Sequence, residues 1–242
     1  MPTNSSSVDY RVGSISDETG PMTFGHPLTE TAQLADHYRQ PSQLVRDKVI
    51  DHLDDGCRDF IARSTFVVLG TSGATGGNDV SPKGGPAGFV KVLDDKRLAI
   101  PDLNGNNLLD SLHNIIETGQ IGLLFVVPGL GETLRVNGTA VVTVDDDILD
   151  RFTDDVRRPT TAIGVTVDQA YIHCAKAFRR GGMWQPEAWP DATCRPSPAA
   201  MLIDHVGVEG FTVEQVEAGL EAGYTSDLEA DRPEIASPAT SM

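Results

Sequence analysis

The segment of residues 131–138, "GETLRVNG", carries side chains that could hold a ligand. Written as a strand, it places Thr133, Arg135 and Asn137 on one face and Leu134 on the other, because side chains alternate with period two. A guanidinium in such a row can donate hydrogen bonds to carbonyl or phosphate oxygens in a fixed geometry. The polar face therefore either meets solvent, as in most half-buried strands, or lines a ligand site.

A second candidate is the cluster of residues 173–184, "HCAKAFRRGGMW". It brings Lys176, Arg179, Arg180 and Trp184 together in a chain that is otherwise acidic. Cations beside a flat aromatic ring suit a phosphorylated aromatic ligand such as a flavin. The alternative is a surface helix whose charges pair with the many carboxylates of the chain.

Polar residues also gather where a helix is expected to start. Asn106, Asn107, Asp110 and Ser111 can cap that helix, or they can leave backbone N–H groups free to bind a phosphate. The negative charge of Asp110 argues against an anion there. Lys83, in the segment "DVSPKGG", is either a solvated lysine of a flexible loop or a ligand contact.

Other common chemistries find no support in the sequence. It has no G-x-S-x-G nucleophile elbow and no Walker A motif, and "GTSGATGG" lacks the spacing of a dinucleotide fingerprint. Cys57, Cys174 and Cys194 form no tight pair and no ligand spacing, so neither a disulfide framework nor a metal site is predicted. No catalytic residue can be assigned from the sequence.

The net charge limits the partners of the protein. The 242 residues include 35 Asp and Glu against 19 Lys and Arg, a net charge of -16. Such a surface repels polyanions, so neither nucleic acid nor a membrane is expected as a partner. The N-terminal segment is polar, and no run reaches the ~18 apolar residues of a membrane span, which predicts a cytoplasmic protein.

The candidate residues would be positioned by antiparallel strands. Apolar periodicity predicts one helix over residues 41–64, an irregular glycine-rich stretch at 73–88, and strands over 65–72, 89–94, 97–102, 120–127, 132–145 and 160–174. Further helices are predicted at 106–119, with Asn106 or Asn107 as the cap and Gly119 as the stop, and at 146–155, 175–180, 199–208 and 212–224. Because the strand connections are short, we expect the six strands to form a small barrel.

Two longer runs resemble a known family. The runs "SPKGGPAGFVKVLDDKRLAIPDLNGNNLLDSLHNIIETGQIGLLFVVPGLGETLRVNGTA" and "YIHCAKAFRRGGMW" are similar to the pyridoxamine 5'-phosphate oxidase-like FMN-binding split barrels, within them to the branch with the "PG.GETLRVNG" signature. The resemblance implies a mainly β, α+β fold: a six-stranded antiparallel split β-barrel with short flanking helices and C-terminal helices. The expected parts are a partly disordered N-terminal extension (1–35), an FMN-binding split-barrel domain with C-terminal helices (36–225) and a disordered acidic tail (226–242).

The resemblance also implies a function. It indicates a homodimer with FMN at the subunit interface, acting as an FMN-dependent oxidoreductase on an unknown small organic substrate. The alternatives are an F420-dependent reductase on the same fold, or a non-catalytic flavin-binding protein.

The resemblance assigns roles to particular residues. The cofactor-binding residues that it implies are Lys83; Phe89, Val90, Lys91, Ile100 and Pro101, through backbone groups at the isoalloxazine ring; Asn107 and Ser111 at the phosphate; Thr133, Arg135 and Asn137 beside the ring; and Lys176 and Trp184 from the other subunit. The chain departs from the family pattern at Leu108 and Gly182, where relatives carry basic residues. Losing a cation beside a phosphate removes a contact worth roughly 1.5–3 kcal/mol, which predicts weaker FMN binding or a different cofactor.

Overall fold

The computed structural model describes residues 24–207 and 210–234 of the chain. The chain divides into two compact units, Met1–Ser42 and Gln43–Met242. In the first unit, the described part contains one short 3-10 helix, η1 (Thr31–Asp36), which begins with a capping box between Glu30 and Gln33. Most of the predicted N-terminal extension and the end of the predicted acidic tail lie outside the described residues.

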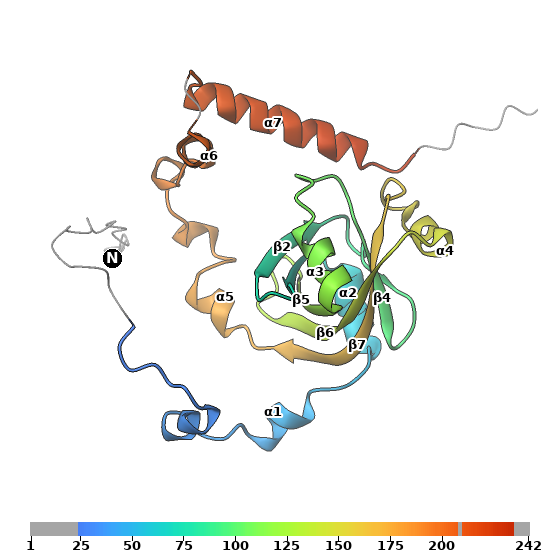
Figure 1. Cartoon of the computed structure of the whole chain (residues 1–242), viewed down its shortest axis with the longest axis vertical. Helices are drawn as coiled ribbons and strands as arrows, with labels where there is room; N and C mark the ends of the chain where they lie inside the picture. The colour runs from blue at the N-terminus through green and yellow to red at the C-terminus, as the bar shows by residue number, and fades with distance from the viewer. Residues whose placement is uncertain (1–23, 208–209, 235–242) are drawn as a thin grey trace, which may run out of the picture. The chain divides into compact units, whose positions relative to one another are not determined.

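The second unit is built on one antiparallel sheet of seven strands (Figure 1). The strands are β1 (Phe66–Ser72), β2 (Asn78–Gly84), β3 (Lys91–Val92), β4 (Arg97–Pro101), β5 (Gln120–Val126), β6 (Thr133–Thr143) and β7 (Ala162–His173). Their order in the sheet is β2-β1-β5-β6-β7-β4-β3. The fold is mainly β within the α+β class, as predicted. It has seven strands instead of six, and the end strands β2 and β3 are not hydrogen-bonded neighbours, so the described sheet does not close.

The additional strand is β2, in the glycine-rich stretch that the sequence predicted to be irregular. It pairs with β1 along its whole length, from Phe66 opposite Gly84 to Ser72 opposite Asn78. The strand lies at the edge of the sheet, where Pro82 is tolerated because its missing N–H is not needed by a second neighbour. None of its side chains is fully buried, so it carries no apolar signal that a sequence pattern could detect.

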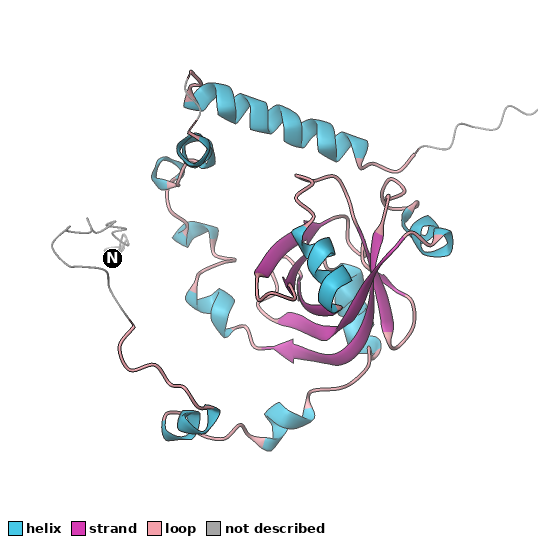
Figure 2. Ribbon diagram, viewed as in Figure 1, coloured by secondary structure: helices cyan, strands magenta, loops and turns pink. Residues whose placement is uncertain are grey.

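Helices flank the sheet (Figure 2). Those of the second unit are α1 (Gln43–Asp47), α2 (Asp55–Arg63), α3 (Asp110–Thr118), α4 (Asp146–Leu149), η2 (Asp150–Phe152), α5 (Lys176–Arg180), η3 (Pro186–Ala188), η4 (Ala192–Cys194), α6 (Pro198–Val206) and α7 (Val213–Ala230). Helix α7 continues past residue 226, where the sequence placed the start of a disordered tail.

The single helix predicted over residues 41–64 is wrong. The segment forms α1 and α2, separated by Ile50, which exchanges two backbone hydrogen bonds with Ala170 of β7. Helix α2 starts separately, because the Asp54 side chain accepts a hydrogen bond from the Cys57 N–H at 2.8 Å. The periodic residue Leu44 is 79% exposed and therefore does not belong to the core.

The main core lies between the inner face of the sheet and the helices α2 and α3. Ile61 of α2 and Ile115 of α3 are buried there with Leu134 and Val136 of β6. The alternation predicted for β6 is confirmed, because Leu134 and Val136 face the core while Arg135 on the other face stays half-exposed. One face of β6 therefore packs in the core, and the face that carries Arg135 is directed away from it.

Helix α3 ends as predicted but starts later. Gly119 is the C-cap, with a left-handed φ of 65° that suits glycine. The N-cap is Leu109, not Asn106 or Asn107, and both Asn107 and Leu109 have positive φ values. The chain therefore makes a tight turn before Asp110, in a conformation that non-glycine residues rarely adopt.

A bulge interrupts the pairing of β6 with β7. The register shifts between Asn137 and Gly138, so that Asn137 lies opposite Gln169 and Gly138 opposite Val167. A Cβ atom on Gly138 would overlap the backbone carbonyl oxygen of Thr166, which explains why glycine occupies this position.

Candidate functional site

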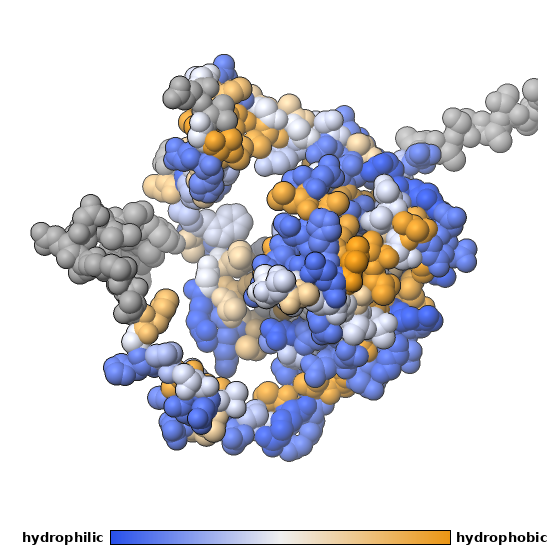
Figure 3. All heavy atoms as spheres, in the orientation of Figure 1, coloured by the Kyte–Doolittle hydropathy of each residue, from blue (hydrophilic) through white to orange (hydrophobic). Residues whose placement is uncertain are grey.

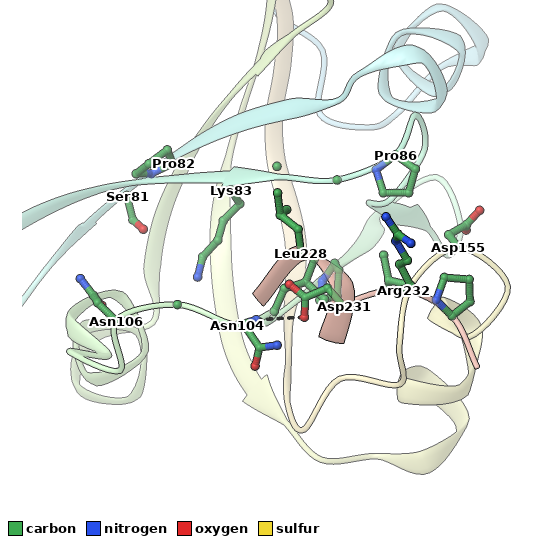
Figure 4. A pocket seen from close by; sticks show the side chains of 17 residues that line it. Ser81, Pro82, Lys83, Pro86, Asn104, Asn106, Asp155, Leu228, Asp231 and Arg232 are labelled. Carbon is green, nitrogen blue, oxygen red and sulfur yellow. Dashed lines mark hydrogen bonds between the residues drawn. The ribbon is translucent and has the colours of Figure 1, made fainter. Parts of the chain in front are cut away.

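The split in the barrel opens into a cleft. A pocket of about 850 Å³ lies between β2, the loop after β4 and the C-terminal end of α7 (Figure 4), and we call it the α7 pocket. A second pocket of about 230 Å³ adjoins it at the start of α3, and we call it the α3 pocket. The two pockets form one cleft because they share lining residues: Ser81, Pro82, Lys83, Leu103, Gly105 and Asn106.

Four of the predicted cofactor-binding residues line this cleft. Lys83 and Pro101 line the α7 pocket, and Lys83, Asn107 and Ser111 line the α3 pocket. Lys83 lies on β2, and its Nζ is 2.9 Å from Oδ1 of Asp102, just after β4. Since both side chains are only about one-fifth exposed, this ion pair links the two sides of the split.

The predicted ring-contacting residues are mostly part of the core. Phe89, Val90 and Ile100 are at most 3% exposed, so only their backbone groups could meet a ligand. Lys91 does not line either pocket, but its ammonium pairs with Asp155, which lines the α7 pocket.

The α3 pocket is acidic, which bears on the predicted phosphate site. Its charged lining residues are three carboxylates, Asp79, Asp102 and Asp110, and one cation, Lys83, that is already paired. The Ser111 hydroxyl donates a hydrogen bond to Asp79. Like charges about 4 Å apart repel by ~1 kcal/mol in bulk water and ~4 kcal/mol near a protein surface. These residues do not fit a phosphate group.

The α7 pocket has a wall that the sequence did not predict. The end of α7 contributes Leu228, Asp231 and Arg232, and Asn104 of the opposite loop donates its backbone N–H to Asp231 Oδ1 at 3.3 Å (Figure 4). The available signal was weak: Leu228, Glu229 and Ala230 favour a helix, but Thr225, Ser226 and Asp227 before them do not.

The remaining predicted residues of β6 lie on the outer face of the sheet. Thr133 is opposite His173 and Arg135 is opposite Tyr171 on β7. Arg135 Nη1 donates to the Tyr171 hydroxyl at 3.1 Å, and Lys48 Nζ lies 5.3 Å from the centre of the same ring. We call Lys48, Arg135, Tyr171 and His173 the outer patch.

Charge and burial in the outer patch affect its histidine. Burial lowers the pKa of His173, and the positive charges of Arg135 and Lys48 lower it further. Neither cation has a carboxylate within ion-pair distance among the described residues. The patch therefore holds two positive charges and a neutral imidazole at physiological pH.

Lys176 and Trp184 lie after β7, near the turn between β5 and β6. Trp184 Nε1 donates to the Leu130 carbonyl at 2.8 Å, and its ring packs edge-on against Phe178. The backbone N–H of Lys176 lowers the pKa of the exposed Cys174 thiol. Neither Lys176 nor Trp184 lines the cleft of its own chain.

Two kinds of site are not found in the described part of the chain. No group of three or more His, Cys, Asp or Glu side chains is placed to hold a metal ion. Among the helices of residues 24–207 and 210–234, none combines the length and the apolarity needed to cross a membrane.

Comparison with known proteins identifies the family. The family model described as pyridoxamine 5'-phosphate oxidase matches residues 53–174, which is half of the chain. The chain therefore belongs to the pyridoxamine 5'-phosphate oxidase family. No curated protein matches it.

Several solved structures are similar over about half of this chain. A variant of HupZ from Group A Streptococcus is 18% identical, with a TM-score of 0.42, over 50% of this chain and 99% of its own. A candidate pyridoxamine 5'-phosphate oxidase from Lactobacillus delbrueckii is 22% identical, with a TM-score of 0.39, over 50% and 95%. An F420 reductase is 14% identical, with a TM-score of 0.34, over 50% and 98%.

Proposed function

We propose that the protein is an FMN-dependent oxidoreductase of the pyridoxamine 5'-phosphate oxidase type that acts on a small organic substrate. The observation that carries this proposal is the cleft in the split barrel, which gathers Lys83, Pro101, Asn107 and Ser111. Family membership supports it, because the matched residues 53–174 include most of the residues that line this cleft.

The shape and lining of the cleft suit a flat ring. About 850 Å³ is within the usual range for cofactor and ligand pockets. Pro86, Pro101, Leu103 and Val156 provide apolar walls that would exclude water from a bound ring. A bound flavin would supply the electron transfer, while the protein would supply orientation and electrostatics.

We infer further that the working form is a homodimer. Thr133, Arg135, Lys176 and Trp184 do not line the cleft of their own chain, so a second copy would have to bring them to it. Hydrophobic side chains also remain exposed on α6, where Figure 3 shows orange atoms, and just before α7: Met201, Leu202 and Val206 on the helix, and Phe211 in the following segment. A two-fold arrangement would complete both sites at once.

Binding of flavin tests the cofactor. FMN fluorescence should be quenched on titration with the protein, and F420 should compete weakly or not at all. Gly105→Phe should weaken FMN binding at least about tenfold, ~1.4 kcal/mol, because Gly105 lines both pockets and open space surrounds a Cβ there. Gly77→Phe is the matched control, since it also meets open space but lines neither pocket.

The outcomes separate the alternatives. Tight F420 binding without FMN binding would favour the F420-dependent reductase. If FMN binds, but no amine reduces the bound FMN and no quinone or dioxygen oxidises its reduced form faster than free reduced FMN, a flavin-binding protein without turnover would be favoured. Equal effects of Gly105→Phe and Gly77→Phe would place the flavin outside the cleft.

Subunit mixing tests the dimer. Light scattering should give about twice the chain mass of 25.9 kDa. If a site combines the cleft of one chain with Arg135 of the other, co-expressing Gly105→Phe chains with Arg135→Ala chains should restore about one quarter of the FMN sites, because half of the dimers are mixed and each has one intact site. A monomer in the presence of FMN, or no recovery in verified mixed dimers, would contradict a shared site.

A further inference from the structure

The outer patch gathers two positive charges around one tyrosine. Lys48 Nζ lies 5.3 Å, and Arg135 Cζ 5.7 Å, from the centre of the Tyr171 ring. Neither cation has a carboxylate within ion-pair distance among the described residues. In a chain with a net charge of -16, uncompensated cations that share one ring mark a place where an anion is attracted.

The patch also holds polar atoms that its own residues leave available. Arg135 Nη1 donates to the Tyr171 hydroxyl at 3.1 Å, so the proton of that hydroxyl can be donated to a ligand. His173 Nε2 is buried and has no hydrogen-bond partner among the described residues. Because a buried polar atom without a partner costs free energy, a ligand that pairs with it is favoured.

Lys48 is held beside Arg135 by contacts with a strand that is far away in the sequence. Its Nζ donates to the Ile172 carbonyl at 2.7 Å, and Ile50 exchanges two backbone hydrogen bonds with Ala170 of the same strand. The remaining N–H groups of the ammonium are left for a ligand. The two cations are therefore in place before an anion arrives, which lowers the entropy cost of binding it.

A groove of about 620 Å³ begins beside the patch on the outer face of the sheet, and we call it the sheet groove. It crosses four neighbouring strands, on which Gly70, Gly122, Asn137 and Gln169 lie opposite one another in turn. Asn137 is on the same face of β6 as Arg135, one alternation further, or about 7 Å along the strand. Because glycines form part of its floor, a flat group can approach the backbone closely.

The sheet groove favours a neutral group. Its charged lining residues are Asp79 and Asp168, whose negative charges repel an anion. Asn137 Nδ2 donates to Gln169 Oε1 at 3.2 Å, and the rest of these two amides can pair with a neutral polar ligand. A ligand with one anionic end and a flat neutral body would therefore lie with its anion at the outer patch and its body in the sheet groove.

We propose that the outer patch binds the carboxylate of a flat organic acid, with Lys48, Arg135 and the Tyr171 hydroxyl as donors and the sheet groove as the seat of its ring. This inference names the substrate class of the proposed oxidoreductase, and to that extent it rests on the proposed function. A planar guanidinium matches the geometry of a carboxylate. The cleft could not hold this group itself, because its lining carries five carboxylates against two cations.

The test compares 2-naphthoate with 2-naphthamide, which have the same flat ring with and without the negative charge. Calorimetric titration of the full-length protein should show that 2-naphthoate binds at least about tenfold more tightly, ~1.4 kcal/mol. Lys48→Gln should weaken 2-naphthoate binding about tenfold and leave 2-naphthamide binding unchanged, because glutamine keeps a donor for the Ile172 carbonyl but lacks the charge.

Arg151→Gln is the matched control for Lys48→Gln. It changes the net charge equally, but Arg151 is exposed and belongs to neither the outer patch nor the sheet groove. Equal affinities of the two probes for the parent protein, or equal effects of the two substitutions on 2-naphthoate, would overturn the proposal.

Gly70→Val tests the seat of the ring. It should weaken the binding of both probes, whereas Gly164→Val should not, because Gly164 lies on the same sheet but does not line the sheet groove. A Cβ atom at Gly70 would lie 3.8 Å from the Gly122 carbonyl oxygen, and one at Gly164 would lie 3.5 Å from Val141 Cγ2, so both sites have room for a side chain. Thermal melts show whether each variant is folded. Equal effects of the two changes would place the ring outside the sheet groove and contradict this part of the proposal.

NMR titration of His173 separates this proposal from the proposed function. 2-Naphthoate should raise the pKa of His173, because it brings a negative charge beside the imidazole, and 2-naphthamide should not. If FMN binds but 2-naphthoate leaves this pKa unchanged, the flavin site stands and the carboxylate site is wrong. If 2-naphthoate raises the pKa but no flavin binds, the carboxylate site stands and the proposed function fails. If neither probe binds and Lys48→Gln converts a dimer into a monomer, the carboxylate comes from a second copy of the chain, which overturns the assignment to a small acid.

Discussion

The cleft and the outer patch both contain predicted cofactor-binding residues, but they balance charge differently. In the cleft, Lys83 is paired with Asp102, a carboxylate of the same chain. In the outer patch, Lys48 and Arg135 both lie against Tyr171 and have no carboxylate partner among the described residues. The lining of the cleft therefore carries five carboxylates against two cations, Lys83 and Arg232, whereas the outer patch presents positive charge without a carboxylate partner among the described residues.

This difference shows what each surface can contribute. The apolar walls of the cleft suit a mainly apolar ring, while its excess of carboxylates repels anionic groups. Unpaired cations on an exposed face attract an oxyanion or a carboxylate that comes from outside the chain.

The largest effect is expected when residues on the two faces of β6 are replaced and the free energies of unfolding are compared. Leu134→Ala should lower the free energy of unfolding by about 2–5 kcal/mol, because it leaves a cavity in the core. Arg135→Ala should cost less than about 1 kcal/mol and should instead weaken flavin binding. Thermal melts and fluorescence titrations on both variants check this. A destabilised Arg135→Ala that binds flavin normally would show that Arg135 serves the fold.

A smaller effect is expected on the free energy of unfolding when Lys83 of the cleft and Lys48 of the outer patch are each replaced. Lys83→Met should cost about 1–2 kcal/mol, because it leaves the Asp102 carboxylate partly buried without its partner. Lys48→Met should cost about 1 kcal/mol or less, because the loss of its contact with Tyr171 and of its exposed 2.7 Å hydrogen bond to the Ile172 carbonyl is partly offset by reduced repulsion of Arg135. Urea unfolding measures both. The double variant Lys83→Met/Asp102→Leu should recover stability relative to Lys83→Met, and failure to do so would indicate that the ion pair does not stabilise the split.

The sequence predicted those helices and strands whose conformation is determined by their own residues. The period-two pattern around Arg135 predicted β6, and Gly119 predicted the end of α3, because alternation and a left-handed cap are local properties. The sequence did not predict β2, because this strand is stabilised by its backbone pairing with β1 and its own side chains show no strand pattern. The helix over 41–64 failed because Ile50 pairs with Ala170, far away in the sequence.

The candidate site was predictable to a similar extent. The residues that line the cleft from β2 and from the α3 turn lie in segments with recognisable signatures. The wall formed by α7 was not predictable, because Asn104 and Asp231 are 127 residues apart and only the folded chain brings them together. The acidity of the α3 pocket was indicated by Asp110 alone, since Asp79 and Asp102 join it only through the tertiary fold.

A still smaller effect concerns Leu108. It lines the α3 pocket and is 63% exposed, so an arginine fits at this position. Leu108→Arg should change FMN affinity by less than about threefold, ~0.7 kcal/mol, because its guanidinium would pair with the carboxylates of that pocket instead of a phosphate. Fluorescence titration measures this. A tenfold tightening would instead place the phosphate at the start of α3, in spite of the carboxylates that line that pocket.

The smallest expected effect is the pH dependence that His173 adds to stability. Its pKa in the folded protein is below the ordinary value of 6.5, because of burial and then the charges of Arg135 and Lys48. At pH values between the pKa of His173 in the folded protein and that in the unfolded chain, the unfolded chain binds more protons than the folded protein. The contribution of His173 to the free energy of unfolding is therefore fully present above about pH 6.5, and it is lost as the pH falls through the folded pKa. Lys48→Met should raise the pKa of His173, measured by NMR titration, and should flatten this part of the stability curve, whereas Lys83→Met in the cleft should leave the pKa unchanged. Equal shifts in both variants would show that the charges of the cleft and of the outer patch are not independent.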